Sequence, residues 1–495
     1  MSSDKTNTRF HILIYGCQMN YADSARIKAI LTHAGMIYVD NIKDAELIIF
    51  DTCSVRQKSE DKIFWKMLEI SANQKVRMTW CMIQHYLRNS KIKKTKTGSI
   101  AKLTQGNFVW SIKENNPVAL WWWDIKGELR HIDRDKDILP INNAFNPLWA
   151  RMHEQFANVE LFFRIDDTGF LPMLARQLGY SVRYDNDLNH EYSQIIPHDS
   201  NQVFSENTKT AYVPISTWCS QFCAYCIVPY SRWLEKNRPV EDIVKEVRHH
   251  LGNGIEEIVL LWQIVNKHPD FVKICKEVLA LDGLKWLRYT SPYPTFFSKE
   301  LLELHENNKK MCPHIHMPLQ SWSDQILKKM FRGYTKSDYI KFVDDIRSLS
   351  RPISITSDII VWFPWETEED FEQSLDLVRY AKFDTVYIGI YSPRPGTLWA
   401  KKYNDDISKE VKKDRRDRLN ELLKKISHDN NQNEIWDVKK VMISRRLKNN
   451  KYFGYTENMK NIIVEGNDRD IKIWDFTDMK ISWWESFKLY GKLDK

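Results

Sequence analysis

The chain has 495 residues, more than a single hydrophobic core usually organises, so we expect about three domains. Its hydrophobic fraction of 43% is typical of a globular protein, and its formal net charge of +8 permits an anionic partner such as RNA without requiring one. No stretch approaches the roughly 18 apolar residues of a membrane span, and residues 1–10 lack the apolar region of a signal peptide. These features exclude a membrane protein and predict a cytoplasmic one.

The first predicted domain covers residues 1–205 and alternates apolar runs with helical segments. Residues 9–15 form a short apolar run, followed by a turn at Gly16-Cys17 and a helix from Asp23. Residues 47–50 form the next run, and residues 159–163 form the last one. Such alternation predicts a parallel α/β sheet whose ligand site lies at the carboxyl ends of its strands.

An insertion interrupts this domain. Between about 86 and 150 the pattern weakens into Lys-rich and Asn-rich sequence, which we interpret as an insertion of low order. Its lysine run, residues 91–96, more often forms a solvated face than an RNA-binding patch. The polar stretch 197–209 predicts a linker to the next domain.

The second and third predicted domains cover residues 206–433 and 434–495. Six apolar runs recur in the second with helices between them, which predicts a full or partial TIM-like barrel with its site at the strand C-termini. They are residues 211–215, 257–261, 287–290, 315–317, 353–356 and 385–388. Short runs at 441–443, 461–464 and 487–490 predict a small C-terminal β-barrel. The expected fold class is therefore α/β, with a small β-barrel at the end.

The eight cysteines are the main chemical signal. In a reducing cytosol they favour metal or redox chemistry over a disulfide framework. Six of them fall into two sets of three, which are Cys17, Cys53 and Cys81, and Cys219, Cys223 and Cys226. The other two, Cys275 and Cys312, stand alone, and we expect them to be small buried side chains.

The cysteines of the second set are clustered directly after the first barrel strand, as Cys219-x3-Cys223-x2-Cys226. Thiolates are the standard ligands of 4Fe–4S clusters, and three of them leave one iron free. A free iron can bind the amino and carboxylate groups of S-adenosylmethionine (SAM), and electron transfer then cleaves SAM to a 5′-deoxyadenosyl radical. With the aromatic Tyr225 before the last cysteine, this is the radical SAM signature. A zinc site is the alternative, but zinc would normally show a fourth ligand nearby.

The cysteines of the first set are far apart in sequence. Cys17 and Cys53 each follow a predicted strand of one sheet, and Cys81 would complete a site at the same edge. They could therefore converge as another three-thiolate site with a vacant iron. Three separate buried cysteines are an equally open interpretation of the residues alone.

Several motifs resemble those of the radical SAM methylthiotransferases over nearly the whole chain apart from the insertion. They are residues 15–20, 51–58, 81–84, 313–321, 391–397, and 361–367 once Trp is replaced by Gly. Within that family, Gln18-Met19-Asn20 resembles the branch that acts on isopentenyladenosine beside the tRNA anticodon. The alternatives are a branch acting on threonylcarbamoyladenosine or on a ribosomal-protein aspartate, and an inactive RNA-binding relic.

The resemblance implies a tRNA partner and the cofactors SAM and two 4Fe–4S clusters. It implies that Cys219, Cys223 and Cys226 hold the cluster that cleaves SAM. The cluster on the other three cysteines would carry sulfur that a second SAM methylates, and the radical would remove hydrogen from adenine so that a methylthio group replaces it. Residues 434–495, which include the motif 454–458, would form an RNA-binding TRAM domain. A small β-barrel without other features could equally be a docking module. We expect a monomer, and the sequence identifies neither the sulfur donor nor the electron donor.

The tryptophan content is unusual. Glycine normally makes up about 7% of residues, which would be about 35 here. The chain has 16 Gly and 19 Trp, and the two counts together equal that expectation. Some bacterial lineages translate the UGA codon as glycine, which would produce this pattern, and we expect glycine in the native protein at positions 80, 218, 322, 362 and 365. Genuine core tryptophans, which we accept for Trp286, and a decaying gene are the alternatives.

Overall fold

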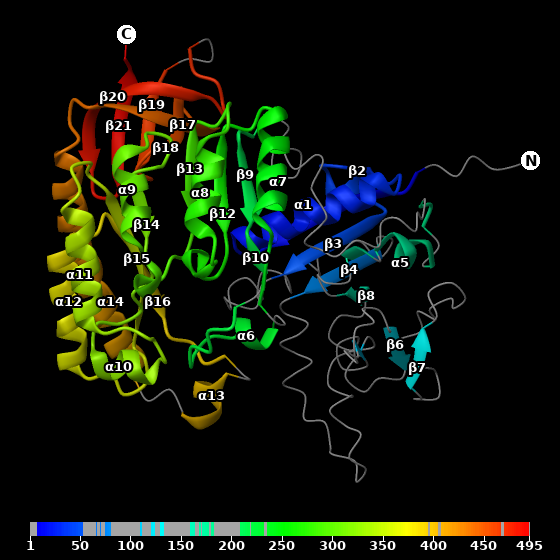
Figure 1. Ribbon diagram of the computed structural model, residues 1–495, viewed down its shortest axis with the longest axis horizontal. Coiled ribbons are helices and arrows are strands. Elements are labelled where there is room, and N and C mark those ends of the chain that lie inside the picture. Colours follow the sequence, from blue (N-terminus) through cyan, green and yellow to red (C-terminus); the bar gives the residue numbers. More distant parts are fainter. Residues whose placement is uncertain are drawn as a thin grey trace, which may run out of the picture. The chain divides into compact units, whose positions relative to one another are not determined.

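The computed structural model describes most of the C-terminal two thirds of the chain and parts of the rest. The described residues are 7–52, 66, 70, 75–80, 109–110, 120–123, 129–132, 159–163, 168–169, 171–177, 180–182, 208–217, 219–231, 235–394, 397–403, 407–466 and 470–494. Cys53, Cys81 and Trp218 lie outside them. The chain divides into two compact units, Met1–Val203 with Cys226–Trp233, and Phe204–Tyr225 with Leu234–Lys495 (Figure 1).

The N-terminal unit contains a five-stranded, entirely parallel sheet, which confirms the predicted parallel α/β fold. Its strand order is β2-β1-β3-β4-β8, with β1 Arg9–Tyr15, β2 Ile37–Tyr38, β3 Leu47–Thr52, β4 Lys75–Trp80 and β8 Val159–Phe163. Every residue of β3 is buried, as expected for an apolar run in a parallel sheet. Among the residues that the structure describes, this unit contains the helices α1 Gln18–His33, η1 Ile42–Asp44, α5 Leu171–Gln177 and α6 Val228–Ser231.

Helix α1 begins at Gln18, so the predicted start at Asp23 is wrong by more than one turn. Cys17 is the N-cap, with an extended backbone, and its N–H donates to the side chain of Asn20 at 3.0 Å. Asn20 thus performs the reciprocal half of a capping box, a role usually taken by Glu or Gln. Because this position carries Asn rather than Glu or Gln, the sequence did not indicate that the helix begins at Gln18.

Part of the expected insertion is ordered. Strands β5 Val109–Trp110, β6 Leu120–Trp123 and β7 Leu129–Ile132 form a three-stranded antiparallel sheet. These strands lie within the predicted insertion, whose role the sequence left uncertain. Their aromatic and aliphatic residues favour extended backbone even though the flanking sequence is polar.

The second unit contains six parallel strands in chain order, which agrees with the predicted partial TIM-like barrel and is called the βα barrel below. The strands are β9 Thr210–Pro214, β12 Glu257–Leu261, β13 Trp286–Tyr289, β14 His314–His316, β15 Ser354–Val361 and β16 Thr385–Ile390. They form two sheets of three, and a parallel bridge between Leu287 and Met311 connects the first sheet to the segment before β14. A short hairpin, β10 Ser216–Thr217 with β11 Lys236–Asn237, flanks the first sheet.

Helices of this unit pack against these strands and bury two apolar cores. The described helices of the unit are α7 Val240–Gly252, η7 Val265–Lys267, α8 Phe271–Leu279, η8 Pro294–Phe296, α9 Lys299–Asn307, α10 Asp324–Lys329, α11 Lys336–Arg347, α12 Glu368–Ala381, α13 Leu398–Lys402 and α14 Lys409–Gln432. Among the described residues, no helix is long and apolar enough to cross a membrane.

The C-terminal strands close into a five-stranded β-barrel, called the small barrel below, as predicted. The strand order is β17-β18-β19-β21-β20, with β17 Val438–Arg446, β18 Lys451–Thr456, β19 Asn461–Glu465, β20 Phe476–Glu485 and β21 Lys488–Leu493. Closure brings β17 against β18 so tightly that a Cβ at Gly454 would lie 2.3 Å from the Met442 carbonyl oxygen. Glycine is therefore required at that position.

The small barrel is fixed to the N-terminal ends of the βα-barrel strands. The buried Glu257, first residue of β12, accepts hydrogen bonds from Arg288 Nε and from the Tyr455 hydroxyl, both at 2.7 Å. Arg288 also donates to the backbone carbonyls of Thr456 and Glu457, at 3.0 and 2.8 Å. Part of the 454–458 motif therefore docks the small barrel onto the βα barrel, at the end opposite the second cysteine set.

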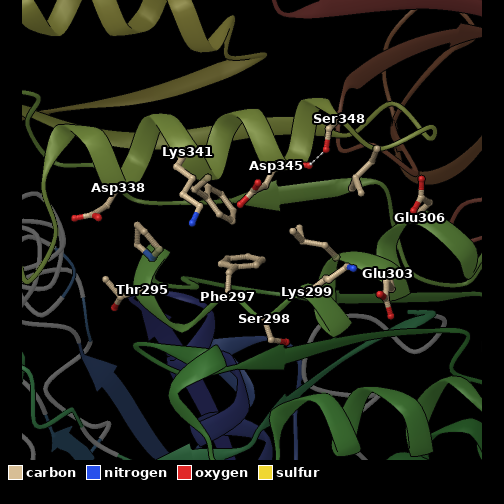
Figure 2. Close-up of a pocket in the computed structure, with 14 residues that line it drawn as sticks. Thr295, Phe297, Ser298, Lys299, Glu303, Glu306, Asp338, Lys341, Asp345 and Ser348 are labelled. Atoms are coloured by element: carbon tan, nitrogen blue, oxygen red, sulfur yellow. Dashed lines mark hydrogen bonds between the residues drawn. The ribbon is translucent and has the colours of Figure 1, made fainter.

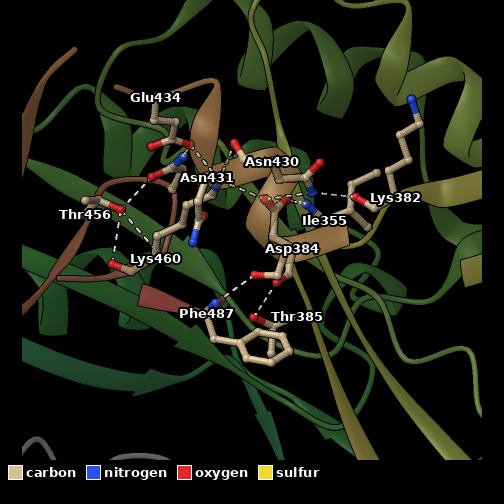
Figure 3. Close-up of polar contacts among 12 residues, drawn as sticks. Ile355, Lys382, Asp384, Thr385, Asn430, Asn431, Glu434, Thr456, Lys460 and Phe487 are labelled. Carbon is tan, nitrogen blue, oxygen red and sulfur yellow. Dashed lines mark hydrogen bonds and ion pairs between the residues drawn. The ribbon is translucent and has the colours of Figure 1, made fainter. Parts of the chain in front are cut away.

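A buried lysine completes this interface, as Figure 3 shows. Lys460 Nζ lies 3.0 Å from Asp384 Oδ1 and 2.8 Å from Glu434 Oε1, and Asn458 also donates to Glu434. Burial alone would lower the pKa of Lys460, but the two carboxylates raise it above its ordinary value. Lys439 Nζ also lies 3.8 Å from Glu434 Oε2, but Lys460 is the lysine that contacts both carboxylates.

Within the described part of the chain, four tryptophans have a left-handed backbone. Their φ angles are +70° at Trp362, +67° at Trp365, +70° at Trp436 and +66° at Trp474. This conformation costs a residue with a Cβ about 1–2 kcal/mol, and glycine adopts it freely. The values at 362 and 365 support the expected glycines there. Trp322 is not left-handed, but its indole N–H is buried without a hydrogen-bond partner among the described residues.

We expect Lys460→Met to destabilise the second unit by about 3–5 kcal/mol, because it removes the buried cation that lies between Asp384 and Glu434. Urea unfolding of the purified chain measures this. Lys480→Met, which removes an exposed lysine from the same small barrel, should change stability by less than about 0.5 kcal/mol. Equal losses in the two variants would contradict a buried ion-pair network.

We expect Trp365→Gly and Trp436→Gly each to stabilise the fold by about 1 kcal/mol, because both side chains are substantially exposed and both backbones are left-handed. Trp286→Gly is the contrasting control. Trp286 is buried in a strand, 4.7 Å from the ring of Phe476, and its loss should cost about 3–5 kcal/mol. Thermal unfolding of the three variants tests the difference, and destabilisation by all three would count against native glycines.

Candidate functional site

The first cysteine set follows three neighbouring strands whose carboxyl ends are aligned. Tyr15 at the end of β1 pairs with Thr52 at the end of β3, and Thr52 pairs with Trp80 at the end of β4. Adjacent strands lie about 4.8 Å apart. Cys17 comes two residues after its strand and is exposed, while Cys53 and Cys81 come one residue after theirs and lie outside the described residues. The three strands therefore end side by side at one edge of the sheet. One cysteine of the set follows each strand end within two residues.

A buried polar network holds the Cys17 turn against the end of β3. Asn20 Nδ2 donates to Asp51 Oδ1 at 2.6 Å and to the Thr52 carbonyl at 3.1 Å, and Ser24 donates to Asp51 Oδ2 at 2.8 Å. The other end of the same amide, Asn20 Oδ1, accepts the Cys17 N–H at 3.0 Å and lies 3.6 Å from its sulfur. Asn20 therefore fixes Cys17 relative to the strand that leads to Cys53.

Gly16 is required for this arrangement. A Cβ on Gly16 would lie 1.9 Å from Asn20 Oδ1, so any side chain would displace the amide that holds the turn. Gly16, Asn20 and Asp51 belong to the motifs 15–20 and 51–58, but the sequence did not indicate that Asn20 and Asp51 contact each other. An aspartate at the end of an apolar strand was the available signal.

The second cysteine set lies on the loop that follows β9 and the short strand β10. Cys219 is partly exposed, Cys223 is buried and Cys226 is partly exposed. The Gln221 N–H donates to Cys219 Sγ at 3.4 Å, and Arg332 Nη1 donates to Cys223 Sγ at 3.6 Å. N–H groups directed at sulfur suit a thiolate that binds metal.

A salt bridge holds one side of this loop. Lys267 Nζ donates to Glu235 Oε2 at 2.9 Å and to Ser220 Oγ at 2.7 Å, and the Ser220 N–H donates to Glu235 at 3.0 Å. Burial would raise the pKa of Glu235, but hydrogen bonds from Ser220 and Lys267 hold it below its ordinary value. Burial raises the pKa of the neighbouring Cys219 thiol to about 11. A metal would therefore have to displace the proton of that thiol.

The inner face of the βα barrel carries polar side chains that our sequence analysis did not single out. Thr356 Oγ1 on β15 lies 2.9 Å from His314 Nε2 and 2.9 Å from His316 Nδ1 on β14, and His316 Nε2 lies 3.3 Å from Asp358 Oδ2. Ile315, between the two histidines, is instead buried in the outer core. The alternation His314-Ile315-His316 was the sequence signal, because alternate residues of a strand point to opposite faces. The two histidines therefore share the face opposite the outer core.

The larger of the described pockets lies elsewhere. It is a groove of about 810 Å³ between α9 and α11 on the outer surface of the βα barrel, as Figure 2 shows. Two of its carboxylates already serve local structure, because Glu306 accepts hydrogen bonds from Ser350 and Asp338 caps α11. No group of three His, Cys, Asp or Glu side chains is arranged to hold a metal ion within the part of the chain that the structure describes.

Comparison with known proteins assigns these features to a family. Residues 213–378 match the Radical SAM superfamily, and residues 9–100 match the uncharacterized protein family UPF0004. The tRNA-2-methylthio-N(6)-dimethylallyladenosine synthase of Carboxydothermus hydrogenoformans is 31% identical, over 98% of this chain and 99% of its own length. This chain belongs to the tRNA-2-methylthio-N(6)-dimethylallyladenosine synthase family of radical SAM methylthiotransferases.

Other members of the family match over similar lengths. The synthase of Caldicellulosiruptor saccharolyticus is 30% identical over 98% of this chain and 93% of its own, and that of Thermotoga petrophila is 31% identical over 98% and 97%. Among solved structures, the radical SAM methyltransferase TsrM of Kitasatospora setae covers 80% of this chain and 77% of its own, at 11% identity and a TM-score of 0.46. The expected cofactors, SAM and 4Fe–4S clusters, are those of the radical SAM methylthiotransferases.

We expect Asn20→Ala to cost about 1–3 kcal/mol, because the buried Asp51 loses its shortest hydrogen bond, and to lower iron binding at the first cysteine set. Iron per chain should be measured after anaerobic reconstitution, with the second set replaced by alanine. Asn41→Ala, which removes an exposed cap of η1, is the control and should not change iron content. Full iron loading of Asn20→Ala would show that the network does not position Cys17.

Proposed function

We propose that this chain methylthiolates N6-isopentenyladenosine next to the tRNA anticodon, giving 2-methylthio-N6-isopentenyladenosine. The observation that carries the proposal is the near-full-length similarity to synthases of that name, in a chain with two sets of three cysteines after the ends of parallel strands. The branch motif Gln18-Met19-Asn20 supports the same substrate.

Cys219, Cys223 and Cys226 are proposed as the ligands of the cluster that binds SAM. Their spacing in the sequence and the N–H donors directed at the sulfurs of Cys219 and Cys223 support a 4Fe–4S cluster with one open iron. When bound, the cluster and SAM supply the radical that removes hydrogen from the adenine ring. The chain's own contribution is to hold the loop, through the Glu235–Lys267 bridge on one side and the 330–334 segment on the other.

Cys17, Cys53 and Cys81 are proposed as the ligands of the auxiliary cluster, which supplies the sulfur that is transferred. The alignment of the three strand ends supports this, because each chain exit is one strand spacing from the next. Asn20 and Asp51 would then orient one ligand rather than bind the cluster themselves.

The proposed domains are residues 1–205, 206–433 and 434–495, the last being the RNA-binding TRAM domain. Basic side chains stack on aromatic rings of the small barrel, with Arg445 4.5 Å from the Phe453 ring and Lys488 5.6 Å from the Tyr490 ring. Such pairs suit phosphate contact beside base stacking. A monomer acting on tRNA in the cytoplasm is proposed, with electron and sulfur donors supplied by other molecules.

The substrate is tested in a host that lacks its own synthase. Expression of the chain should convert isopentenyladenosine in tRNA to its 2-methylthio form, measured by mass spectrometry of digested tRNA. Methylthiolation of threonylcarbamoyladenosine with isopentenyladenosine untouched would reject this assignment.

The two cysteine sets should separate the two chemical steps. Reconstituted chain should hold about eight irons. Replacing Cys219, Cys223 and Cys226 by alanine should halve that number and abolish SAM cleavage. Replacing the first set should also halve the iron, yet retain cleavage and lose methylthiolation. The double variant Cys275→Ala/Cys312→Ala, which removes two buried thiols outside both sets, is the control for cysteine loss. Unchanged iron after removal of the first set would exclude the auxiliary cluster.

A further inference from the structure

The segment after α10 lies directly against the second cysteine loop. The Ala224 N–H donates to the Met330 carbonyl at 3.0 Å, which joins the two backbones one residue after Cys223. Two residues further along the segment, Arg332 directs Nη1 at the sulfur of Cys223 at 3.6 Å. This contact joins residues 109 positions apart in the sequence.

The guanidinium of Arg332 is held rigidly. Its Nε donates to the Tyr334 hydroxyl at 3.1 Å and its Nη2 donates to the Pro318 carbonyl at 3.1 Å. It also lies over the rings of Tyr293 and Tyr334, 4.6 and 5.1 Å from their centroids. These four contacts fix the plane of the guanidinium group. In that orientation Nη1 points towards the sulfur of Cys223.

The charge of Arg332 has no carboxylate partner within 4.0 Å among the residues that the structure describes. Three buried arginines of the same unit do have carboxylate partners. Arg238, Arg288 and Arg415 pair with Glu246, Glu257 and Glu366 respectively. Lys267, the cation nearest Cys219, is neutralised by Glu235. Arg332 is therefore an uncompensated positive charge placed beside a thiol of the radical SAM motif.

We propose that Arg332 is a positioning residue that orients Cys223 and raises the reduction potential of the cluster held by Cys219, Cys223 and Cys226. The inference rests on the proposed function, since it requires a cluster on these cysteines. Reduction adds one electron from an external reductant and makes or breaks no bond in the protein. A fixed cation and an N–H donor at a ligand sulfur stabilise the added negative charge, which makes that reduction easier.

The test isolates this cluster by using the chain in which Cys17, Cys53 and Cys81 are alanine. Dithionite titration followed by electron paramagnetic resonance gives the midpoint potential. Arg332→Gln should lower the equilibrium constant for reduction at least tenfold, a fall of about 59 mV for a one-electron couple. Arg332→Lys, which keeps the charge and loses the fork, should fall between Gln and the parent.

Arg347→Gln is the matched control. Arg347 is also held by backbone carbonyls, of Ile353 and Ala381, but it contacts no cysteine. Its loss should affect stability without moving the potential. An unchanged potential in Arg332→Gln with full iron, or an equal shift in Arg347→Gln, would overturn the proposal.

If Arg332→Gln does not retain iron, a second substitution still tests the proposal. Tyr334→Phe leaves Arg332 in place but removes the hydroxyl that accepts its Nε, and it should shift the potential in the same direction by less. No shift in Tyr334→Phe, when Arg332→Gln is iron-free, would mean that Arg332 serves folding alone and would also overturn the proposal. Absence of iron and of SAM cleavage in the parent would instead reject the proposed function itself.

Discussion

The in-register parallel pairing of β1, β3 and β4 is the constraint on which the N-terminal site depends. Backbone hydrogen bonds align the ends of these strands, so three chain exits that are far apart in sequence leave one edge of the sheet side by side. A slip of one residue would turn the side chains of a strand to the other face, and the fully buried β3 does not tolerate that. The βα barrel uses the same rule, because its cysteine loop also follows the carboxyl end of a parallel strand, next to the β10–β11 hairpin.

The two cysteine loops are held by different polar groups. The Cys17 turn depends on Asn20, which is itself held by the Asp51 carboxylate, and both oxygens of Asp51 accept hydrogen bonds. The Cys219 side of the other loop is held by the Glu235–Lys267 bridge, and Cys223 lies against the guanidinium of Arg332. In each unit the contacts that hold the loop include residues that lie in or follow other strands of the same sheet or barrel, so the loop geometry depends on the fold rather than on the loop sequence alone.

Much of this architecture could be predicted from the sequence because continuous apolar runs mark buried parallel strands, and β8 and β12 have the predicted bounds. The polar contacts could not, since they join residues without periodic spacing. Asn20 and Asp51 are 31 positions apart, and Arg332 lies 109 positions from Cys223. The docking role of Tyr455 was hidden for a similar reason. The motif 454–458 predicts an RNA-binding domain by resemblance, and only the fold brings Tyr455 to the buried Glu257.

The backbone separates two kinds of tryptophan in this chain. Trp286 is extended and packs between Phe476 and Tyr455, so its ring stabilises the contact between the two barrels. Trp362 and Trp365 have left-handed backbones in the loop after β15, where the chain turns back towards α12. The turn itself is held by Glu366, which accepts the N–H of residue 362 at 2.8 Å and is bound by Arg415. These two hydrogen bonds use the backbone N–H of residue 362 and the side chains of Glu366 and Arg415. They therefore form whether residue 362 is tryptophan or glycine. The φ angles at positions 362 and 365 are ones that glycine adopts without strain, and the hydrogen bonds that hold the turn do not use the indole rings. Glycine at both positions would therefore form the same turn.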